Sequence, residues 1–445
     1  MSMPSPTTPV EISRDLTHRI LKELVGSSPL QRLKIRLWDG SYWPENASDS
    51  CGTTLVLNHP GALREMLLAN SESALGEAYL QNDFDVEGDM EAAFELADII
   101  RAQTHGWSQK LKMAHLLWQL PPRPADREPV SLRQAALDEK QHSVSRDQAA
   151  VQFHYDLSND FYSLWLDSRK VYSCAYFQNA TDDLDSAQLH KLDTICRKLG
   201  LRPGQRLMDI GCGWGGLILH VAAHYGVRAT GITLSERQAE YAHQRISALG
   251  LQERVEVRLQ DYRALEGHED YDAVVSVGMV EHVGRTNLPL YFGAVNRLLK
   301  PGGLFLNHGI CTGAVPALPH EASFIDKYVF PDSDLFPISE MLAPAEVAGF
   351  EIRDVENLRE HYALTLRHWV RRLERHHGEA LKFVSEPVYR TWRAYMAGSA
   401  HRFNFGFLAV YQTLLAKLSA SGEANVPLSR AEWYGTSRIE SRTSA

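Results

Sequence analysis

The segment 207–222 limits what this chain can fold into more than any other stretch. A short apolar run ends at Asp209, glycines follow at alternate positions, and a helical pattern extends from Gly216 to about Tyr225. The alternating glycines are Gly211, Gly213 and Gly215. Only glycine lets the main chain turn this tightly and approach a ligand so closely. The segment therefore predicts the first strand, turn and helix of a nucleotide-binding α/β sheet, with a purely structural turn as the alternative.

Further strand and helix patterns repeat after this turn in the manner of an α/β fold. The expected strands are 227–231, 255–259, 271–278 and 299–308. Ser235 suits the N-cap of the helix after the first of them. Ligands bind at the carboxyl ends of the strands in open α/β sheets, so polar residues at these ends are candidate ligand contacts. They are Asp209, Thr233, Gln260, Asp261, Glu281 and His308.

The glycine turn differs from a dinucleotide-binding fingerprint. That fingerprint requires an acidic residue about twenty positions after its glycines, whereas this turn carries Trp214 and the second strand ends in Thr233. A small adenosyl ligand fits better, and we interpret the site as one for S-adenosylmethionine. Gln260 and Asp261 would then meet the adenine. The amino-acid portion would meet the turn at Asp209, Gly211 and Gly213.

Length and a proline-rich segment predict more than one domain. At 445 residues the chain is too long for one ordinary core, and the prolines at 121–124 mark the best boundary. We expect a Rossmann-like α/β domain with helical insertions, preceded by a smaller mixed α+β domain. The expected parts are a disordered tail at 1–12, an N-terminal domain at 13–120, a linker at 121–145, a catalytic domain at 146–430 and a C-terminal tail at 431–445.

Two segments outside the expected sheet carry local predictions. In 74–88, acidic and apolar side chains are mixed, and the simplest interpretation is a solvated acidic face. The residues concerned are Glu77, Asp83, Asp85 and Glu87. Towards the end of the chain, helical patterns are expected near 319–327 and 389–417.

Composition argues against several functional classes. With a net charge of -9, the chain lacks the excess of cations that general nucleic-acid binding needs. It has no run of about 18 apolar residues that would predict a transmembrane helix, and the N-terminus has no apolar signal-peptide core, so we expect a cytoplasmic protein. The five cysteines are scattered without paired spacing. They indicate neither a disulfide framework nor a zinc site, and we expect no metal.

Several motifs, taken together, closely resemble those of the cyclopropane fatty acid synthases. The resemblance covers about residues 145–415 and rests on YSCAYF at 172–177, DIGCGWGG at 209–216, GITLSE at 231–236, MVEHVG at 279–284, HGI at 308–310 and HYALTLRHW at 361–369. It implies the Rossmann-like sheet of an S-adenosylmethionine-dependent methyltransferase that converts cis double bonds in phospholipid acyl chains to cyclopropanes. In this context we expect further cofactor contacts from Tyr172, Ser173, Thr233, Leu234 and Gln238.

The resemblance also implies how a proton is removed. An alkene is a weak nucleophile, and its attack on the sulfonium methyl leaves a carbocation, which needs a base and a site without water. In the family a bicarbonate ion is that base, and its cradle corresponds here to Cys174, Glu281, His308, the backbone of Ile310 and Tyr362. Adjacent anions repel, so we expect Glu281 and bicarbonate to share a proton network. Taken singly, these residues also suit core packing or a helix cap.

The partners and the product are less constrained. The basic run 367–377 suits attraction to an anionic membrane, or simply a solvated helix face. The N-terminal domain suits lipid binding or homodimerisation. We expect phospholipid acyl chains at the inner membrane surface as the substrate, reached by peripheral association, and no nucleic acid as a partner. The alternatives are a methylene- or methyl-branched product, a small-amine N-methyltransferase, or a non-catalytic lipid-binding protein.

Overall fold

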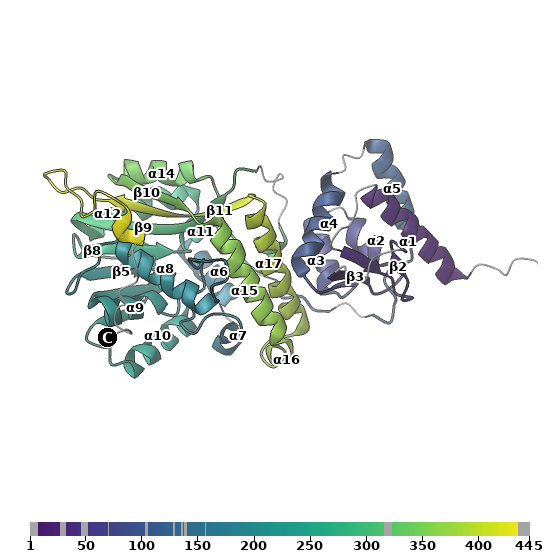
Figure 1. Cartoon of the computed structure of the whole chain (residues 1–445), viewed down its shortest axis with the longest axis horizontal. Helices are drawn as coiled ribbons and strands as arrows, with labels where there is room; N and C mark the ends of the chain where they lie inside the picture. The colour runs from purple at the N-terminus through teal and green to yellow at the C-terminus, as the bar shows by residue number, and fades with distance from the viewer. Residues whose placement is uncertain are drawn as a thin grey trace, which may run out of the picture. The chain divides into compact units, whose positions relative to one another are not determined.

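The computed structural model of this chain forms two compact units (Figure 1). It describes residues 8–26, 33–45, 52–69, 71–102, 106–127, 130–134, 137, 140–155, 157–315 and 323–434. Unit 1 comprises Met1–Gln134, His320–Val329 and Val384–His401, and unit 2 comprises Ala135–Pro319, Phe330–Phe383 and Arg402–Ala445. The catalytic domain expected at 146–430 is therefore interrupted, because two of its segments pack within unit 1.

Unit 1 contains a mixed sheet with the strand order β2-β1-β3-β4. The strands are β1 (Leu33–Arg36), β2 (Tyr42–Trp43), β3 (Thr53–Leu57) and β4 (Phe84–Glu87). The helices are α1 (Pro9–Val25), α2 (Ala62–Leu67), α3 (Glu72–Leu80), α4 (Met90–Ala102), α5 (Trp107–Gln119), α13 (Phe324–Tyr328) and most of α17 (Glu386–Asn404). The expected α+β class is confirmed. The expected disordered tail at 1–12 is wrong from Thr8 onward, because Thr8 and Glu11 form a capping box that begins α1.

The expectation of a solvated acidic face around β4 is wrong for Asp83, which is buried, whereas Glu87 is exposed as expected. Asp83 is fully buried, and its carboxylate accepts hydrogen bonds from Arg123 at 2.7 and 2.5 Å. Asp85 accepts a hydrogen bond from Arg390 of α17 at 3.0 Å. A buried carboxylate needs such partners to offset its desolvation. These arginines lie far from β4 in the sequence, so a local pattern of charges does not reveal them.

Unit 2 is built on a sheet with the strand order β10-β11-β9-β8-β5-β6-β7. The strands are β5 (Arg206–Ile210), β6 (Arg228–Thr233), β7 (Val255–Leu259), β8 (Tyr271–Val277), β9 (Leu299–Thr312), β10 (Glu351–Asn357) and β11 (Leu408–Ala416). Neighbouring strands from β9 to β7 in this order are parallel, whereas β11 is antiparallel to both β9 and β10. The predicted Rossmann-like sheet is confirmed.

The helix expected at 389–417 is wrong in its second half. Helix α17 ends at Asn404, and Gly406, whose φ is 78°, precedes strand β11. Because β11 lies between two other strands and is almost entirely buried, its apolar residues form a nearly continuous run. Periodicity alone does not distinguish such a strand from a buried helix.

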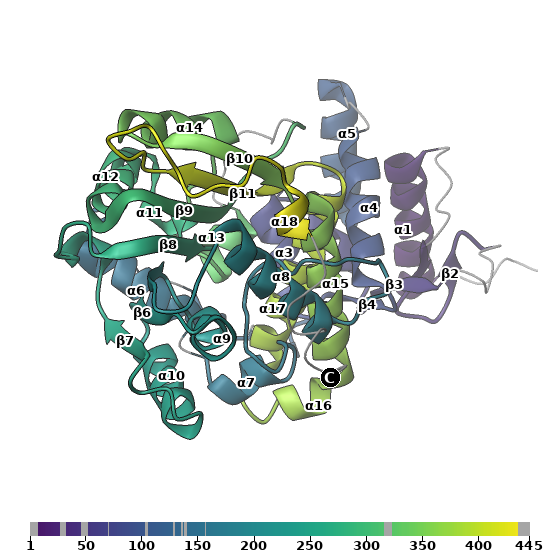
Figure 2. The same ribbon diagram turned by 60° about the vertical axis from the view of Figure 1, so that its left-hand side comes forward.

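Helices cover both faces of the unit 2 sheet (Figure 2). The helices that begin in unit 2 are α6 (Val144–Tyr155), α7 (Asn159–Ser163), α8 (Leu184–Lys198), α9 (Gly216–Tyr225), α10 (Glu236–Ala248), α11 (Val280–Val283), α12 (Leu288–Leu298), α14 (Ile338–Val347), α15 (Arg359–Arg375), α16 (His377–Ala380) and α18 (Ala431–Tyr434). Leu304 and Leu306 of β9 pack in one core with α8, α9 and α10, while Phe305 packs in a second core with α12 and α14. Successive side chains of a strand face opposite ways, so one strand serves both layers.

The end of the described chain is also structured. The expected C-terminal tail at 431–445 is wrong for 431–434, which form α18, and its buried Trp433 joins the core that contains α8. Residues 435–445 lie outside the described part. No helix in the described ranges is both long and apolar enough to cross a membrane.

Candidate functional site

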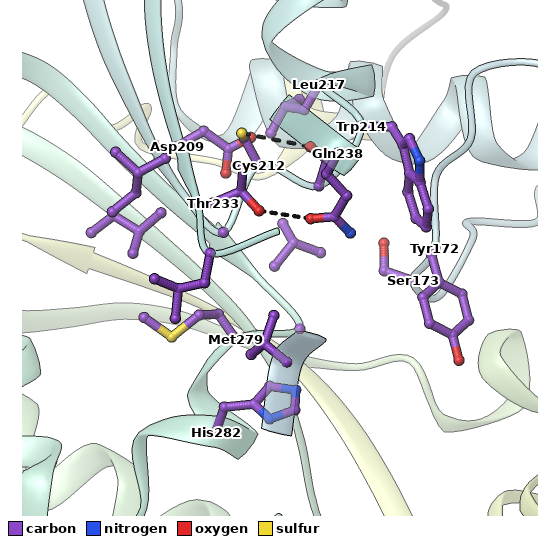
Figure 3. Close-up of a pocket in the computed structure, with 18 of the residues that line it drawn as sticks. Tyr172, Ser173, Asp209, Cys212, Trp214, Leu217, Thr233, Gln238, Met279 and His282 are labelled. Carbon is purple, nitrogen blue, oxygen red and sulfur yellow. Dashed lines mark hydrogen bonds between the residues drawn. The ribbon is translucent and has the colours of Figure 1, made fainter. Parts of the chain in front are cut away.

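A pocket lies at the carboxyl ends of β5, β6, β7 and β8 in unit 2. Every cofactor contact expected from the sequence lines it: Tyr172, Ser173, Asp209, Gly211, Gly213, Thr233, Leu234, Gln238, Gln260 and Asp261. Figure 3 shows Tyr172 and Ser173 on the opposite side of the pocket from Asp209 and Thr233. This edge of an open α/β sheet is where ligands bind, and the fold brings the separate motifs to one cavity there.

The glycine turn is held against the neighbouring strand. Gly211 and Gly213 have φ values of 88° and 54°, in the region that side chains rarely adopt. The backbone N–H groups of Gly211 and Cys212 both donate to the carbonyl of Ile232 on β6, at 3.0 and 2.9 Å. A Cβ at Gly231 would lie 2.7 Å from the sulfur of Cys212. Glycine is therefore required in the turn and also in the strand that it approaches.

Two buried ionisable residues, one acidic and one basic, line the pocket: Asp209 and Lys191. One carboxyl oxygen of Asp209 has no hydrogen-bond partner among the described residues, and burial raises the pKa of Asp209 to about 7. Lys191 of α8, almost fully buried, donates from Nζ to the hydroxyl of Ser173 at 2.9 Å, and burial lowers its pKa to about 8. Lys191 could not be predicted as a site residue, because a single lysine in a helical pattern carries no motif. Together the two side chains can meet the amino and carboxylate groups of an amino-acid ligand.

The expected adenine end of the pocket contains internal hydrogen bonds. The hydroxyl of Thr233 donates to the side-chain oxygen of Gln238 at 2.7 Å. Both carboxylate oxygens of Asp261 accept from Arg263, at 2.8 and 2.6 Å. The side-chain amide of Gln260 donates to the carbonyl of Ala264 at 2.8 Å. An adenine ring would therefore have to share Asp261 with Arg263, a partner that the sequence analysis did not anticipate.

Aromatic side chains add to one wall of the pocket. Trp214 of the glycine turn donates from Nε1 to the side-chain oxygen of Asn159 at 2.7 Å. The ring of Tyr155, which also lines the pocket, lies 5.8 Å from that of Trp214 at 76°. The sequence signal for these contacts was the concentration of aromatic residues in 149–162. Such rings make a rigid apolar wall for a ligand.

The residues expected to form the anion cradle do not line this pocket and are largely buried beside its strands. Glu281 of α11 accepts a hydrogen bond from the backbone N–H of Ile310 at 2.7 Å through Oε1, while no residue that the structure describes bonds Oε2. Burial raises the pKa of Glu281 to about 7. The structure thus joins two of the predicted residues directly, with a carboxyl group that can hold or release a proton near neutral pH.

His308 presents a second polar atom without a partner. It pairs with Val277, the last residue of β8, and its ring is buried. Its Nδ1 lies 3.2 Å from the side-chain nitrogen of Gln412, while Nε2 has no hydrogen-bond partner within the described ranges. Burial and the charges of Lys191 and Lys198 lower the pKa of His308 well below its usual range. The imidazole is therefore neutral at physiological pH.

Cys174 and Tyr362 come together through helix α15. The thiol of Cys174 lies 3.7 Å from the carbonyl of Leu358, which precedes α15, and burial raises the pKa of the thiol, so it stays protonated. The ring of Tyr362, one turn further on, lies 6.1 Å from Trp369, whose ring is 5.1 Å from Tyr172 of the pocket. A continuous set of aromatic contacts thus connects this part of the cradle to the pocket.

Comparison with known proteins gives matches over the same region. Residues 142–413 match the family described as mycolic acid cyclopropane synthetase, and residues 20–103 match a domain of unknown function, DUF7884. A probable fatty acid methyltransferase of Pseudomonas putida is 37% identical over 405 residues, covering 90% of this chain and 96% of the relative. The cyclopropane-fatty-acyl-phospholipid synthase of Escherichia coli K12 is 39% identical over 264 residues, covering 59% of this chain and 66% of the relative.

A solved structure shares the fold of the same region. The mycolic acid cyclopropane synthase CmaA1, complexed with SAH and CTAB, is 36% identical with a TM-score of 0.57, covering 61% of this chain and 98% of that chain. All residues of the pocket fall within the matched range 142–413. The family expected from the motifs is confirmed by these matches.

Proposed function

This chain belongs to the mycolic acid cyclopropane synthetase family, and we propose that it adds a methylene group across cis double bonds of phospholipid acyl chains, forming cyclopropanes. Its family and fold make it an S-adenosylmethionine-dependent methyltransferase. The observation that carries the finer proposal is that two buried polar atoms, Oε2 of Glu281 and Nε2 of His308, have no hydrogen-bond partner in the described part of the chain. Acid and base groups held in a dry site suit removal of a proton from a cation.

The pocket fits the methyl donor. Glycine-turn backbone, the unpartnered oxygen of Asp209 and the ammonium of Lys191 suit the amino-acid portion of S-adenosylmethionine. When bound, S-adenosylmethionine supplies an electrophilic methyl group. The protein orients this group, and the aromatic wall at Tyr155 and Trp214 limits the approach of water.

In the proposed reaction the π electrons of the double bond form a bond to the methyl carbon as the sulfur–carbon bond breaks. The cation then loses a proton from the new methyl group, and the electrons of that C–H bond close the ring. Water would trap the cation as an alcohol, so its exclusion decides the product. An anion about 4 Å from the cation would contribute about 4 kcal/mol at an effective dielectric constant near 20.

The cradle fits a small anion that can share a proton. A buried polar atom without a partner is costly, and Oε2 of Glu281 and Nε2 of His308 are two such atoms among the described residues, which a small anion could satisfy. When bound there, bicarbonate would supply the base for the methyl proton. The N–H of Ile310 is engaged by Glu281, so an anion would share that donor with the carboxyl group. The raised pKa of Glu281 lets this carboxyl stay protonated beside a second anion.

For access to its substrate, we propose that α5 meets the surface of an anionic bilayer. Trp107, Leu111 and Trp118, here called the α5 stripe, are 83%, 69% and 66% exposed. Their spacing places them on one face of the helix. Helix α5 also carries Lys110 and has no acidic residue, while its second lysine, Lys112, pairs with Glu23 at 2.7 Å. Exposed tryptophans favour the membrane interface, and lysines favour anionic head groups, so this face is complementary to such lipids.

The test of the proposed function is product analysis. Purified protein is incubated with S-adenosylmethionine and vesicles of unsaturated phospholipid, and the fatty esters are examined by mass spectrometry and proton NMR. We expect a mass gain of one methylene, with loss of olefinic protons and appearance of ring protons. A pendant methylene or methyl branch would reassign the product, and no gain would leave an amine substrate or a binding role.

A further inference from the structure

The residues behind His308 determine which of its ring nitrogens carries the proton. His308 on β9 and Gln412 on β11 are directly opposed partners on neighbouring antiparallel strands, and both side chains are buried. The amide nitrogen of Gln412 lies 3.2 Å from Nδ1 of His308. A side-chain amide has a donor end and an acceptor end, so its orientation decides whether Nδ1 accepts or donates.

Lys198 decides that orientation. Its Nζ, at the end of α8, lies 3.0 Å from the side-chain oxygen of Gln412. An ammonium group has only donors, so it must meet the acceptor end of the amide. Lys198 is itself buried and held by the carboxylates of Glu356 at 2.5 Å and Asp354 at 3.5 Å. These two anions keep the ammonium in place, and the NH2 end of Gln412 is left to face His308.

A neutral imidazole has one N–H group and one acceptor nitrogen. Because Gln412 offers only N–H donors to Nδ1, this nitrogen is the acceptor. We propose that Lys198 and Gln412 are positioning residues that fix His308 in the tautomer with its proton on Nε2, so that His308 is a hydrogen-bond donor in the cradle. The burial of His308 and the two nearby lysine charges keep it neutral, which excludes a doubly protonated ring at physiological pH.

The role of this tautomer rests on the proposed function, whereas its existence does not. A proton on Nε2 means that His308 cannot accept the proton from the methyl group. It instead donates to an anionic base, which holds that base in place and leaves the proton-accepting role to it. Glu281, whose Oε2 is not bonded by any described residue, is then the residue of the pair that exchanges protons.

The direct experiment is long-range ¹H–¹⁵N correlation NMR of the full-length protein with labelled histidine, without cofactor or substrate. The His308 signal is assigned as the one lost in His308→Asn. We expect a protonated Nε2 and an unprotonated Nδ1 in the wild-type protein. A protonated Nδ1 in that spectrum would overturn the proposal, and this reading needs no variant to fold other than the one used for assignment.

Gln412→Glu supplies the matched perturbation. A carboxylate accepts from Lys198 and also from His308, so the proton should move to Nδ1. We expect turnover to fall about 10–100-fold, the usual effect of removing an outer partner of a histidine ligand, with affinity for S-adenosylmethionine unchanged. Thr413→Val is the control, since Thr413 is the neighbouring buried residue and its hydroxyl donates to the backbone carbonyl of Asn307, at 3.1 Å. It should leave both tautomer and turnover as in the wild type.

The NMR spectrum and the turnover measurement test the tautomer of His308 and the proposed function independently. An unchanged tautomer in folded Gln412→Glu, or an equal fall in turnover for Thr413→Val, would refute the positioning role. If the wild-type protein makes no cyclopropane, the NMR result still decides the tautomer. The activity of the wild type, by contrast, decides the function.

Discussion

Replacing Glu281 with Gln should lower activity and raise stability at the same time. Gln retains a side-chain oxygen that can accept from the N–H of Ile310, a bond of 2.7 Å in the wild type, so the local geometry is preserved. The substitution removes the carboxyl group that can take up and release a proton near neutral pH. Turnover should therefore fall by about 10²–10⁴, the usual contribution of a general acid or base. Affinity for S-adenosylmethionine should be unchanged, since Glu281 does not line the pocket.

The gain in stability follows from the pKa of Glu281. Burial raises this pKa from 4.5 to about 7, so the unfolded chain releases the proton at a lower pH than the folded chain does. The wild type therefore keeps its full stability below about pH 4.5 and loses stability as the pH rises to 7, by about 3 kcal/mol in total. Gln has no charge to bury. At pH 8, Glu281→Gln should have the larger free energy of unfolding, by up to about 3 kcal/mol.

Product analysis checks the expected fall in turnover of Glu281→Gln, and urea unfolding at pH 5 and pH 8 checks its expected gain in stability. Glu346→Gln, an exposed residue of α14, is the control and should change neither quantity. Near-normal turnover of Glu281→Gln would remove Glu281 from the mechanism. A stability difference between variant and wild type that does not grow with pH would refute the raised pKa.

Two further predictions concern the cofactor and the membrane. Lys191→Met should weaken binding of S-adenosylmethionine by about tenfold or more in calorimetry, because a buried charge-assisted donor is lost. The control Lys191→Arg, which keeps a charged donor, should bind S-adenosylmethionine more tightly than the Met variant does. Unchanged affinity in Lys191→Met would exclude a role of Lys191 in the pocket. Trp107→Ser with Trp118→Ser should weaken sedimentation with phosphatidylglycerol vesicles by about tenfold or more, whereas Val347→Ser, an exposed control 86% accessible on α14, should not. Unchanged vesicle binding of the double Trp variant would refute the membrane role of the α5 stripe. If the wild type is a dimer and the double variant a monomer, the α5 stripe would be assigned to self-association instead.

Local sequence patterns predicted those elements of the fold whose physical cause lies within the same segment. The glycines of 211–215 adopt backbone angles that other residues avoid, and Ser235 caps α10 through its own side chain. The strand pattern at 255–259 coincides with β7, because alternation of buried and exposed residues is visible in the sequence. These features predicted the sheet, and the residues expected to contact the cofactor all line one pocket.

Features that depend on distant partners were not predictable. Asp83 is buried because Arg123 meets it, and β11 is a strand because β9 and β10 flank it. Gln412 and Lys198 carry no motif, and their relation to His308 arises only when α8 and β11 pack together. The chemistry of a buried group is therefore set by the fold, even where the group itself is evident from the sequence.

The most direct test of the central claim uses S-adenosylmethionine with a trideuterated methyl group. If a base in the cradle removes a proton from the transferred methyl and the ring then closes, the fatty ester should retain two deuterium atoms, and its olefinic protons should be replaced by ring methine protons. Retention of all three deuterium atoms would show that the proton leaves from elsewhere. That result, or a pendant methylene in place of the ring, would contradict the account.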